Sequence, residues 1–89
     1  MIVEFERHLR CTNLAENTVK SYLFAVRQFY ERYDSVTKRS LKEYKAWLIE
    51  QYKPKTVNLR IRAINCYLES IGKSAWALSS IKVQQKAFL

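Results

Sequence analysis

The chain has 89 residues but only one glycine, Gly72, and one proline, Pro54. A β-sandwich or β-barrel needs a tight turn about every 8–12 residues, and glycine and proline are the residues that most often form such turns. Their scarcity therefore argues against an all-β fold and favours a few helices joined by short polar loops. A chain of this length is one domain, near the lower limit of what folds alone. We predict a single all-α domain.

Apolar side chains recur at the spacing of amphipathic helices in four parts of the chain. The first part is short, residues 2–9. The second is the clearest: a cap at Asn17 or Thr18 precedes an apolar face that continues as far as Tyr33. This face consists of Val19, Tyr22, Leu23, Val26, Phe29, Tyr30 and Tyr33.

Two further helices are expected in the second half of the chain. The third covers residues 40–52 and starts with a capping box whose first residue is Ser40. The proline then interrupts the pattern, because it lacks a backbone N–H. The fourth helix starts at Lys55 or Thr56 and ends at Gly72, a residue type that readily takes positive φ after a helix. Together these segments predict a compact four-helix bundle.

The pattern changes after Gly72. The next apolar residues favour an extended or irregular course, and residues 81–84 alternate as a strand would. We expect Trp76 to dock on the bundle and the last few residues to be loose. The predicted organisation is a helical domain over residues 1–72 and a connector over residues 73–89.

Basic residues are in clear excess. Lysine and arginine number 16 against eight aspartates and glutamates, which gives a formal net charge of +8. Residues 51–89 hold most of it, with seven basic side chains and one acidic, Glu69. Such a balance is typical of nucleic-acid contact, but an anionic membrane, an acidic protein partner or solubility alone can also account for it.

The sequence offers neither a membrane segment nor a visible signal peptide. Its longest uncharged stretch, Ser74–Ile81, is eight residues long, whereas a spanning helix needs about 20 apolar residues. The N-terminus has no basic region followed by an apolar run. We expect a cytoplasmic protein without a membrane partner.

No residue pattern indicates catalysis. The single histidine, His8, cannot form a metal site alone, because such sites usually need three or four ligands. One glycine cannot make a glycine-rich nucleotide loop. The carboxylates are scattered among basic neighbours, as on solvated helix faces. We predict no enzymatic activity, no cofactor and no metal for this chain.

Side chains suited to DNA contact gather on the second and fourth predicted helices. On the fourth, Asn58, Arg62 and Asn65 recur at i, i+4 and i+7, and Asn and Arg pair well with adenine and guanine edges. Both helices have polar starts, and the free N–H groups of a helix N-terminus bind phosphate. The residues predicted to contact DNA are Asn17, Thr18, Lys20, Ser21, Arg27, Lys55, Thr56, Asn58, Arg62 and Asn65.

These basic and polar residues are also compatible with three roles that do not involve duplex DNA. Lysine and arginine are good helix formers, so each one can simply lie on a solvated face. The basic face can also meet an acidic protein partner. A third possibility is a single-strand or RNA binder, in which aromatic residues off the main apolar faces, Phe24 and Tyr67, stack on bases.

Three segments resemble a known family. Residues 17–29 look like the second helix of the core-binding domain of tyrosine recombinases, the SAM-like N-terminal domain of phage integrases. Residues 55–65 resemble the fourth helix of that domain, and residues 81–86 resemble its connector. The likeness covers residues 1–72, although the Asn-Pro that often follows the fourth helix in the family is missing.

The resemblance implies a function. In this family the core-binding domain and a catalytic domain close around duplex DNA, with the second and fourth helices facing the major groove. The implied partners are double-stranded DNA, a catalytic domain in the full-length chain, and other recombinase protomers. The family's catalytic tyrosine and its Arg, Lys and His partners belong to the other domain. The resemblance therefore implies a DNA-gripping domain that does not itself cut.

Overall fold

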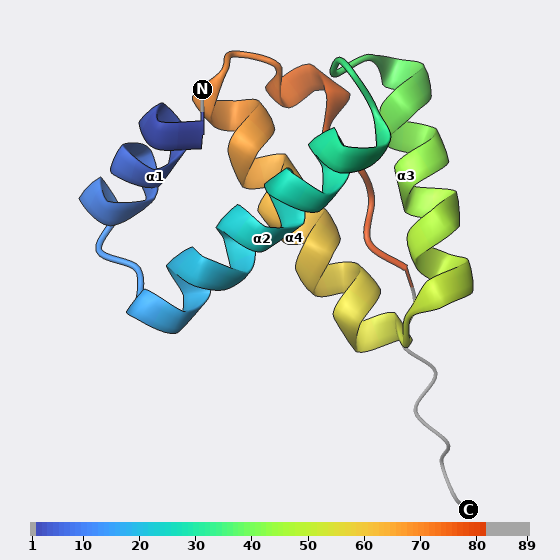
Figure 1. The fold of residues 1–89 in the computed structure, drawn as a ribbon, viewed down its shortest axis with the longest axis horizontal. Coiled ribbons are helices and arrows are strands. Elements are labelled where there is room, and N and C mark those ends of the chain that lie inside the picture. The colour runs from blue at the N-terminus through green and yellow to red at the C-terminus, as the bar shows by residue number, and fades with distance from the viewer. Residues whose placement is uncertain (1, 82–89) are drawn as a thin grey trace, which may run out of the picture.

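The computed structural model describes residues 2–81 (Figure 1). Their helices confirm the predicted all-α class, and these residues contain no strand. No helix in this part of the chain is both long and apolar enough to cross a membrane. The elements are α1 (Ile2–Cys11), α2 (Glu16–Arg32), α3 (Lys38–Gln51), α4 (Pro54–Ser70) and a short 3₁₀ turn, η1 (Ser74–Trp76).

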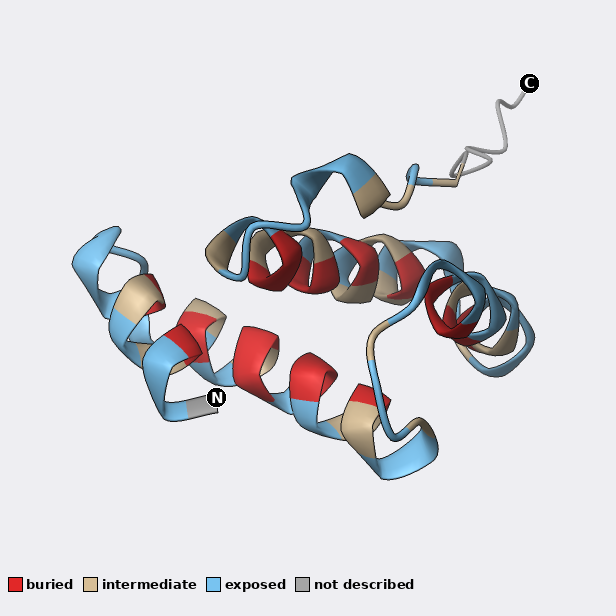
Figure 2. Cartoon of the chain, turned by 90° about the horizontal axis from the view of Figure 1, so that it is seen from above, coloured by how far each residue is buried: buried red, intermediate tan, exposed pale blue. Residues whose placement is uncertain are grey.

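Helix α4 is the centre of the bundle. It crosses α2, which lies on one of its sides, while η1 and the residues after it lie on the other (Figures 1 and 2). The buried residues of α2 and α4 face each other (Figure 2). Helix α1 covers one end of this pair and α3 the other (Figure 1). The strand-like alternation and loose end expected beyond residue 81 lie outside the described residues.

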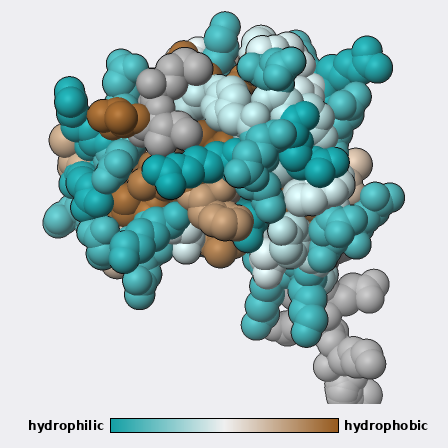
Figure 3. Space-filling view, viewed as in Figure 1, coloured by the Kyte–Doolittle hydropathy of each residue, from teal (hydrophilic) through white to brown (hydrophobic). Residues whose placement is uncertain are grey.

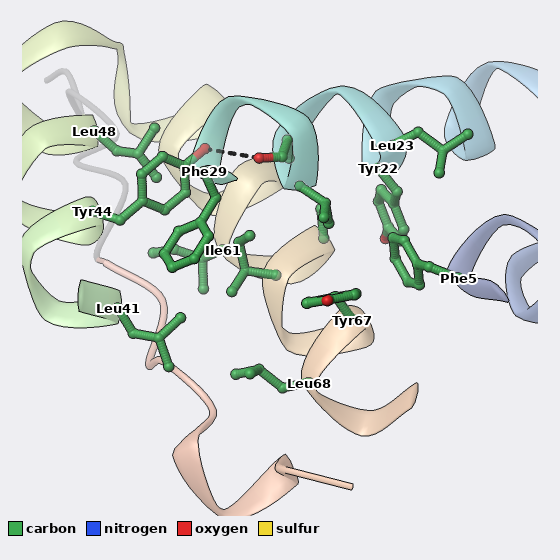
Figure 4. Packing of buried hydrophobic residues seen from close by; sticks show 14 of the residues in the cluster. Phe5, Tyr22, Leu23, Phe29, Leu41, Tyr44, Leu48, Ile61, Tyr67 and Leu68 are labelled. Carbon is green, nitrogen blue, oxygen red and sulfur yellow. Dashed lines mark hydrogen bonds between the residues drawn. The ribbon is translucent and has the colours of Figure 1, made fainter. Parts of the chain in front are cut away.

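The core contains an unbroken chain of aromatic rings that passes through all four helices. In Figure 4, Phe5 of α1 lies against Tyr67 of α4, and Phe29 of α2 lies against Tyr44 of α3. The two pairs are joined through Tyr30. Neighbouring centroids are 5.1–6.0 Å apart, mostly in the edge-to-face geometry that aromatic quadrupoles favour. In order, the chain is Phe5, Tyr67, Tyr30, Phe29, Tyr44, Trp47 and Tyr52.

The hypothesis that Tyr67 is a surface aromatic is wrong, because only 2% of it is exposed. Tyr67 is buried because α1, α2 and α3 all pack on α4, so the buried face of this helix extends to Ala63 and Tyr67. The Tyr67 hydroxyl is satisfied by the Tyr30 hydroxyl at 2.7 Å. Phe24, in contrast, is on the surface as expected, with 54% exposed.

Helix α3 begins earlier than its sequence pattern predicts. Its N-cap is Thr37, whose side chain accepts a hydrogen bond from the Ser40 backbone N–H at 3.0 Å. The Ser40 hydroxyl in turn accepts from the Thr37 backbone N–H at 2.9 Å. Ser40 is thus the last residue of a capping box, at position N3, and not its first. A serine oxygen replaces the usual Glu or Gln at that place, which hides the motif in the sequence.

The other helix starts also differ from expectation. Helix α2 begins at Glu16 with Ala15 as its N-cap, so neither Asn17 nor Thr18 caps it. Helix α4 begins at Pro54, because proline fits the first helical position, where no N–H is needed. These shifts are small, and all four helices lie where the apolar spacing places them.

Gly72 ends α4 as predicted, with a φ of +76°. The Lys73 N–H bonds the Leu68 carbonyl at 2.7 Å, and the Gly72 N–H bonds the Glu69 carbonyl at 3.2 Å, which is the pattern of a Schellman motif. This turn sends the chain back along α4.

We expect Gly72→Ala to lower the free energy of unfolding by about 1 kcal/mol. The cost is conformational, since a Cβ at this position would meet no atom within 4 Å. Urea unfolding followed by circular dichroism measures it. A loss of several kcal/mol would contradict a purely conformational cost and point to tight packing around the turn.

Candidate nucleic-acid interface

Helices α2 and α4 begin along the same edge of the molecule, the lower edge in Figure 1. Neither N-cap side chain, Ala15 or Lys53, makes a capping hydrogen bond. The first backbone N–H groups of both helices therefore retain the partial positive charge of a helix N-terminus. The two helices thus present two anion-attracting ends on one edge.

A hollow of about 310 Å³ lies between the first halves of these helices. Lys20, Ser21 and Phe24 line it from α2, and Leu59 and Arg60 line it from α4. Phe24 and Leu59 are both exposed, so the hollow combines apolar surface with cationic side chains. In Figure 3 apolar side chains are visible near the middle of the face among hydrophilic ones.

Arg60 is held in place by residues of α2 and by Tyr52, which directly follows α3. Its guanidinium lies 4.6 Å from the Phe24 ring centroid and 5.0 Å from that of Tyr52. Its Nη1 donates to Gln28 Oε1 at 2.7 Å, and the Tyr44 hydroxyl donates to the same oxygen at 2.9 Å. Gln28 Nε2 completes the network by donating to the Tyr52 hydroxyl at 3.0 Å. Arg60 therefore connects α4 to α2 and packs against the exposed ring of Phe24.

Burial raises the pKa of Tyr44 to about 12, although the nearby Arg60 favours the ionised form. The hydroxyl therefore stays protonated at neutral pH and remains a hydrogen-bond donor. Sequence patterns alone do not select Gln28 or Arg60, because both look like ordinary polar positions between apolar ones. Only the folded chain brings them together across 32 positions.

The acidic residue in the first turn of α2 has a basic partner. Glu16, in the first turn of α2, pairs with Arg10 of α1 at 2.8 Å, and this hydrogen bond lowers the Glu16 carboxyl pKa. Arg10 also binds Glu6 one turn earlier on α1. Among residues 2–81, no three His, Cys, Asp or Glu side chains are grouped so that they could hold a metal ion. The chemistry of the edge is therefore cationic and polar.

Most of the ten predicted DNA contacts are accessible on these two helices. Lys20 and Ser21 line the hollow, while Arg27 is exposed two turns after Lys20 and does not line it. Arg62 is exposed in the middle of α4. At the helix starts, Asn17 and Lys55 are exposed, whereas Thr18 and Thr56 are half-buried.

The remaining two predicted contacts, Asn58 and Asn65, are half-buried and already have partners. Each amide forms two hydrogen bonds with the backbone of the segment that follows Gly72. Asn65 binds Leu78, and Asn58 binds Ile81. The structure therefore separates these two asparagines from the other eight residues.

The fold and this edge define a small helical module whose two central helices begin along one edge and present Lys20 and Lys55 there. A family model of the N-terminal SAM-like domain of phage integrases matches residues 1–78. The chain belongs to this family, which confirms the resemblance seen in its second and fourth helices and gives it a recombinase-related role. The match concerns the N-terminal domain and not the catalytic one. No curated protein and no solved structure matches the chain.

Proposed function

We propose that this domain binds duplex DNA along the edge where α2 and α4 begin, as the core-binding domain of a site-specific recombinase. The observation that carries the proposal is the pairing of two uncapped helix starts with a cation-lined hollow between them. Family membership supports the recombinase role. The proposed contacts are Asn17, Thr18, Lys20, Ser21, Arg27, Lys55, Thr56 and Arg62.

In this proposal the N–H groups, the cationic side chains and the apolar side chains of the edge make different contacts with DNA. The first N–H groups of both helices bind phosphates, and Lys20, Lys55 and Arg62 neutralise further phosphates. Such contacts position the duplex without reading its sequence. Phe24 and Leu59 present apolar surface between the two helices, and a phenyl ring is one of the groups that can contact a thymine methyl in the major groove.

In this proposal DNA strands are cut and rejoined by a separate catalytic domain. A recombinase that cuts through a tyrosine needs a cationic cluster to stabilise the transferring phosphate. Three tyrosines of this domain are buried in its core: Tyr22, Tyr44 and Tyr67 are at most 8% exposed. The domain would hold the site for integration or excision while a catalytic domain and further protomers complete the assembly.

Salt dependence tests the proposal. We expect the domain to bind a labelled duplex weakly, with a dissociation constant of about 10⁻⁴–10⁻⁶ M at physiological salt, and to lose affinity steeply as salt rises. Fluorescence anisotropy over a potassium chloride series measures this.

Two further ligands separate the competing functions. A single strand of the same length and an acidic peptide of the same charge are titrated under identical conditions. Preference for the duplex supports the proposal. Tighter binding of the single strand favours stacking on Phe24, and tighter binding of the peptide favours a protein partner. Equal binding of all three leaves only general electrostatic attraction and contradicts the proposal.

A further inference from the structure

The segment after η1 runs back along α4 in an extended form. We call residues 77–81 the return segment. The backbone N–H of Leu78 donates to Asn65 Oδ1 at 2.7 Å, and Asn65 Nδ2 donates to the Leu78 carbonyl at 2.8 Å. Ile81 and Asn58 form the same pair of bonds, at 2.8 and 3.0 Å. Two asparagines thus bind the return segment as a neighbouring strand would, through both backbone groups of one residue.

The spacing of the two asparagines matches the spacing of the residues they bind. Asn58 and Asn65 are two helical turns apart, which is about 10.5 Å along α4. Leu78 and Ile81 are three residues apart, which is about 10 Å in an extended chain. The match holds only if the segment runs opposite to α4, and the turn at Gly72 makes it do so. Helix and return segment are therefore in register over two turns.

Neighbouring contacts hold the return segment from its other side. Lys45 of α3 donates to the Ser79 hydroxyl at 3.2 Å. The side chains of Leu78 and Ile81 are half-buried against the hydrophobic core, and Trp76 packs there before them. The segment therefore belongs to the folded domain up to its last described residue.

An amide engaged in this way is not free to read a base. Asparagine recognises adenine with one N–H and its oxygen together, and the backbone of Leu78 or Ile81 uses that same pair of atoms. Bidentate reading of a base by either asparagine would require release of the return segment. Release would expose the N–H and carbonyl groups of both residues and uncover their apolar side chains.

We propose that Asn58 and Asn65 are a two-point clamp for the return segment and do not read bases. The clamp fixes the position of Ile81, beside Asn58 in the first half of α4. That position lies near the edge proposed to bind DNA, so the clamp holds residue 81 next to the duplex. Only this last consequence depends on the proposed function; the clamp itself does not.

Hydrogen exchange of the full chain tests the clamp without DNA. We expect the double variant Asn58→Ala, Asn65→Ala to reduce protection of the Leu78 and Ile81 amides by at least about tenfold. Amides of α2, such as that of Val26, should keep their protection and show that the core remains folded. Unchanged protection at residues 78 and 81 would overturn the proposal.

Single variants test the clamp even if the double variant does not fold. Asn58→Ala should release Ile81 and leave Leu78 protected, and Asn65→Asp should weaken the Leu78 contact only partly, because it keeps the acceptor. Arg62→Ala is the matched control: it lies on the same face of α4 between the two asparagines and makes no bond to the return segment, so exchange at both amides should stay unchanged. Equal effects of Asn58→Ala on both amides would contradict two independent points of attachment.

Adding duplex separates the clamp from base reading. The clamp requires that saturating duplex leave Leu78 and Ile81 protected, and that the asparagine variants keep the wild-type salt slope. Loss of protection when DNA binds would mean that duplex and return segment compete for the amides, and would overturn the proposal. If no variant and no salt concentration shows DNA binding, the proposed function fails, while the exchange results still decide the clamp.

Discussion

Replacing Tyr44 with alanine should lower the free energy of unfolding by about 3–5 kcal/mol, the largest effect expected for a single substitution in this domain. The ring is fully buried and lies 5.3 Å from Phe29 and 6.0 Å from Trp47. Its hydroxyl donates to Gln28 and lies 3.3 Å from the Ala25 carbonyl oxygen (dashed line in Figure 4). Alanine would leave a large cavity where three helices meet. Urea unfolding monitored by circular dichroism measures the loss.

Tyr44→Phe is the matched control. It keeps the ring and removes only the hydroxyl, and Gln28 Oε1 would still accept the hydrogen bond from Arg60. We expect a loss of about 1 kcal/mol, typical of one hydrogen bond. If the two variants were equally unstable, the hydrogen-bond network would carry the effect, and the packing of the ring would not.

Removing three cations from the proposed interface should weaken DNA binding most strongly. The triple variant Lys20→Ala, Lys55→Ala, Arg62→Ala loses charge from both helices and leaves the Arg60 network intact. Because each neutralised phosphate releases about 0.9 counterion, the slope of log affinity against log salt should fall by about 2–3. At moderate salt the affinity should fall about 10- to 100-fold. The same anisotropy titration measures both quantities.

The control for this experiment removes the same charge elsewhere. Arg7, Lys38 and Lys42 are exposed on α1 and at the start of α3, away from the edge where α2 and α4 begin. Their triple alanine variant has the same net charge as the interface variant and should keep most of the wild-type affinity. Equal losses in the two variants would show that only net charge matters and would remove the case for a defined edge.

The number and order of the helices could be predicted because each helix buries one face. The spacing of apolar residues identifies that face directly. Gly72 marks the end of α4 because glycine takes the positive φ needed after a helix more readily than other residues do. Helix starts were less predictable. Ser40 fits the first place of a capping box as well as the last, and only the position of the Thr37 hydroxyl distinguishes the two.

The candidate site was only partly predictable, for a different physical reason. Exposure of Lys20 or Arg62 follows from their place opposite an apolar face. The partners of Asn58 and Asn65 depend on where the chain goes after Gly72, and no local pattern carries that information. The same is true of Arg60, whose neighbours come from α2 and from the end of α3. Polar residues that bind distant parts of the chain look identical, in sequence, to those that bind a ligand.

The ring chain that passes through all four helices has a consequence for how the domain unfolds. From Phe5 to Tyr52, each ring contacts the next one. A helix that detached from the bundle would therefore expose an aromatic ring of a neighbouring helix to water. Partly unfolded forms are therefore costly, and the domain should unfold in a single transition. Near-ultraviolet dichroism, which reports the rings, and far-ultraviolet dichroism, which reports the helices, should have one midpoint. Such a domain is either fully folded or fully unfolded. The edge where α2 and α4 begin is therefore formed completely or not at all.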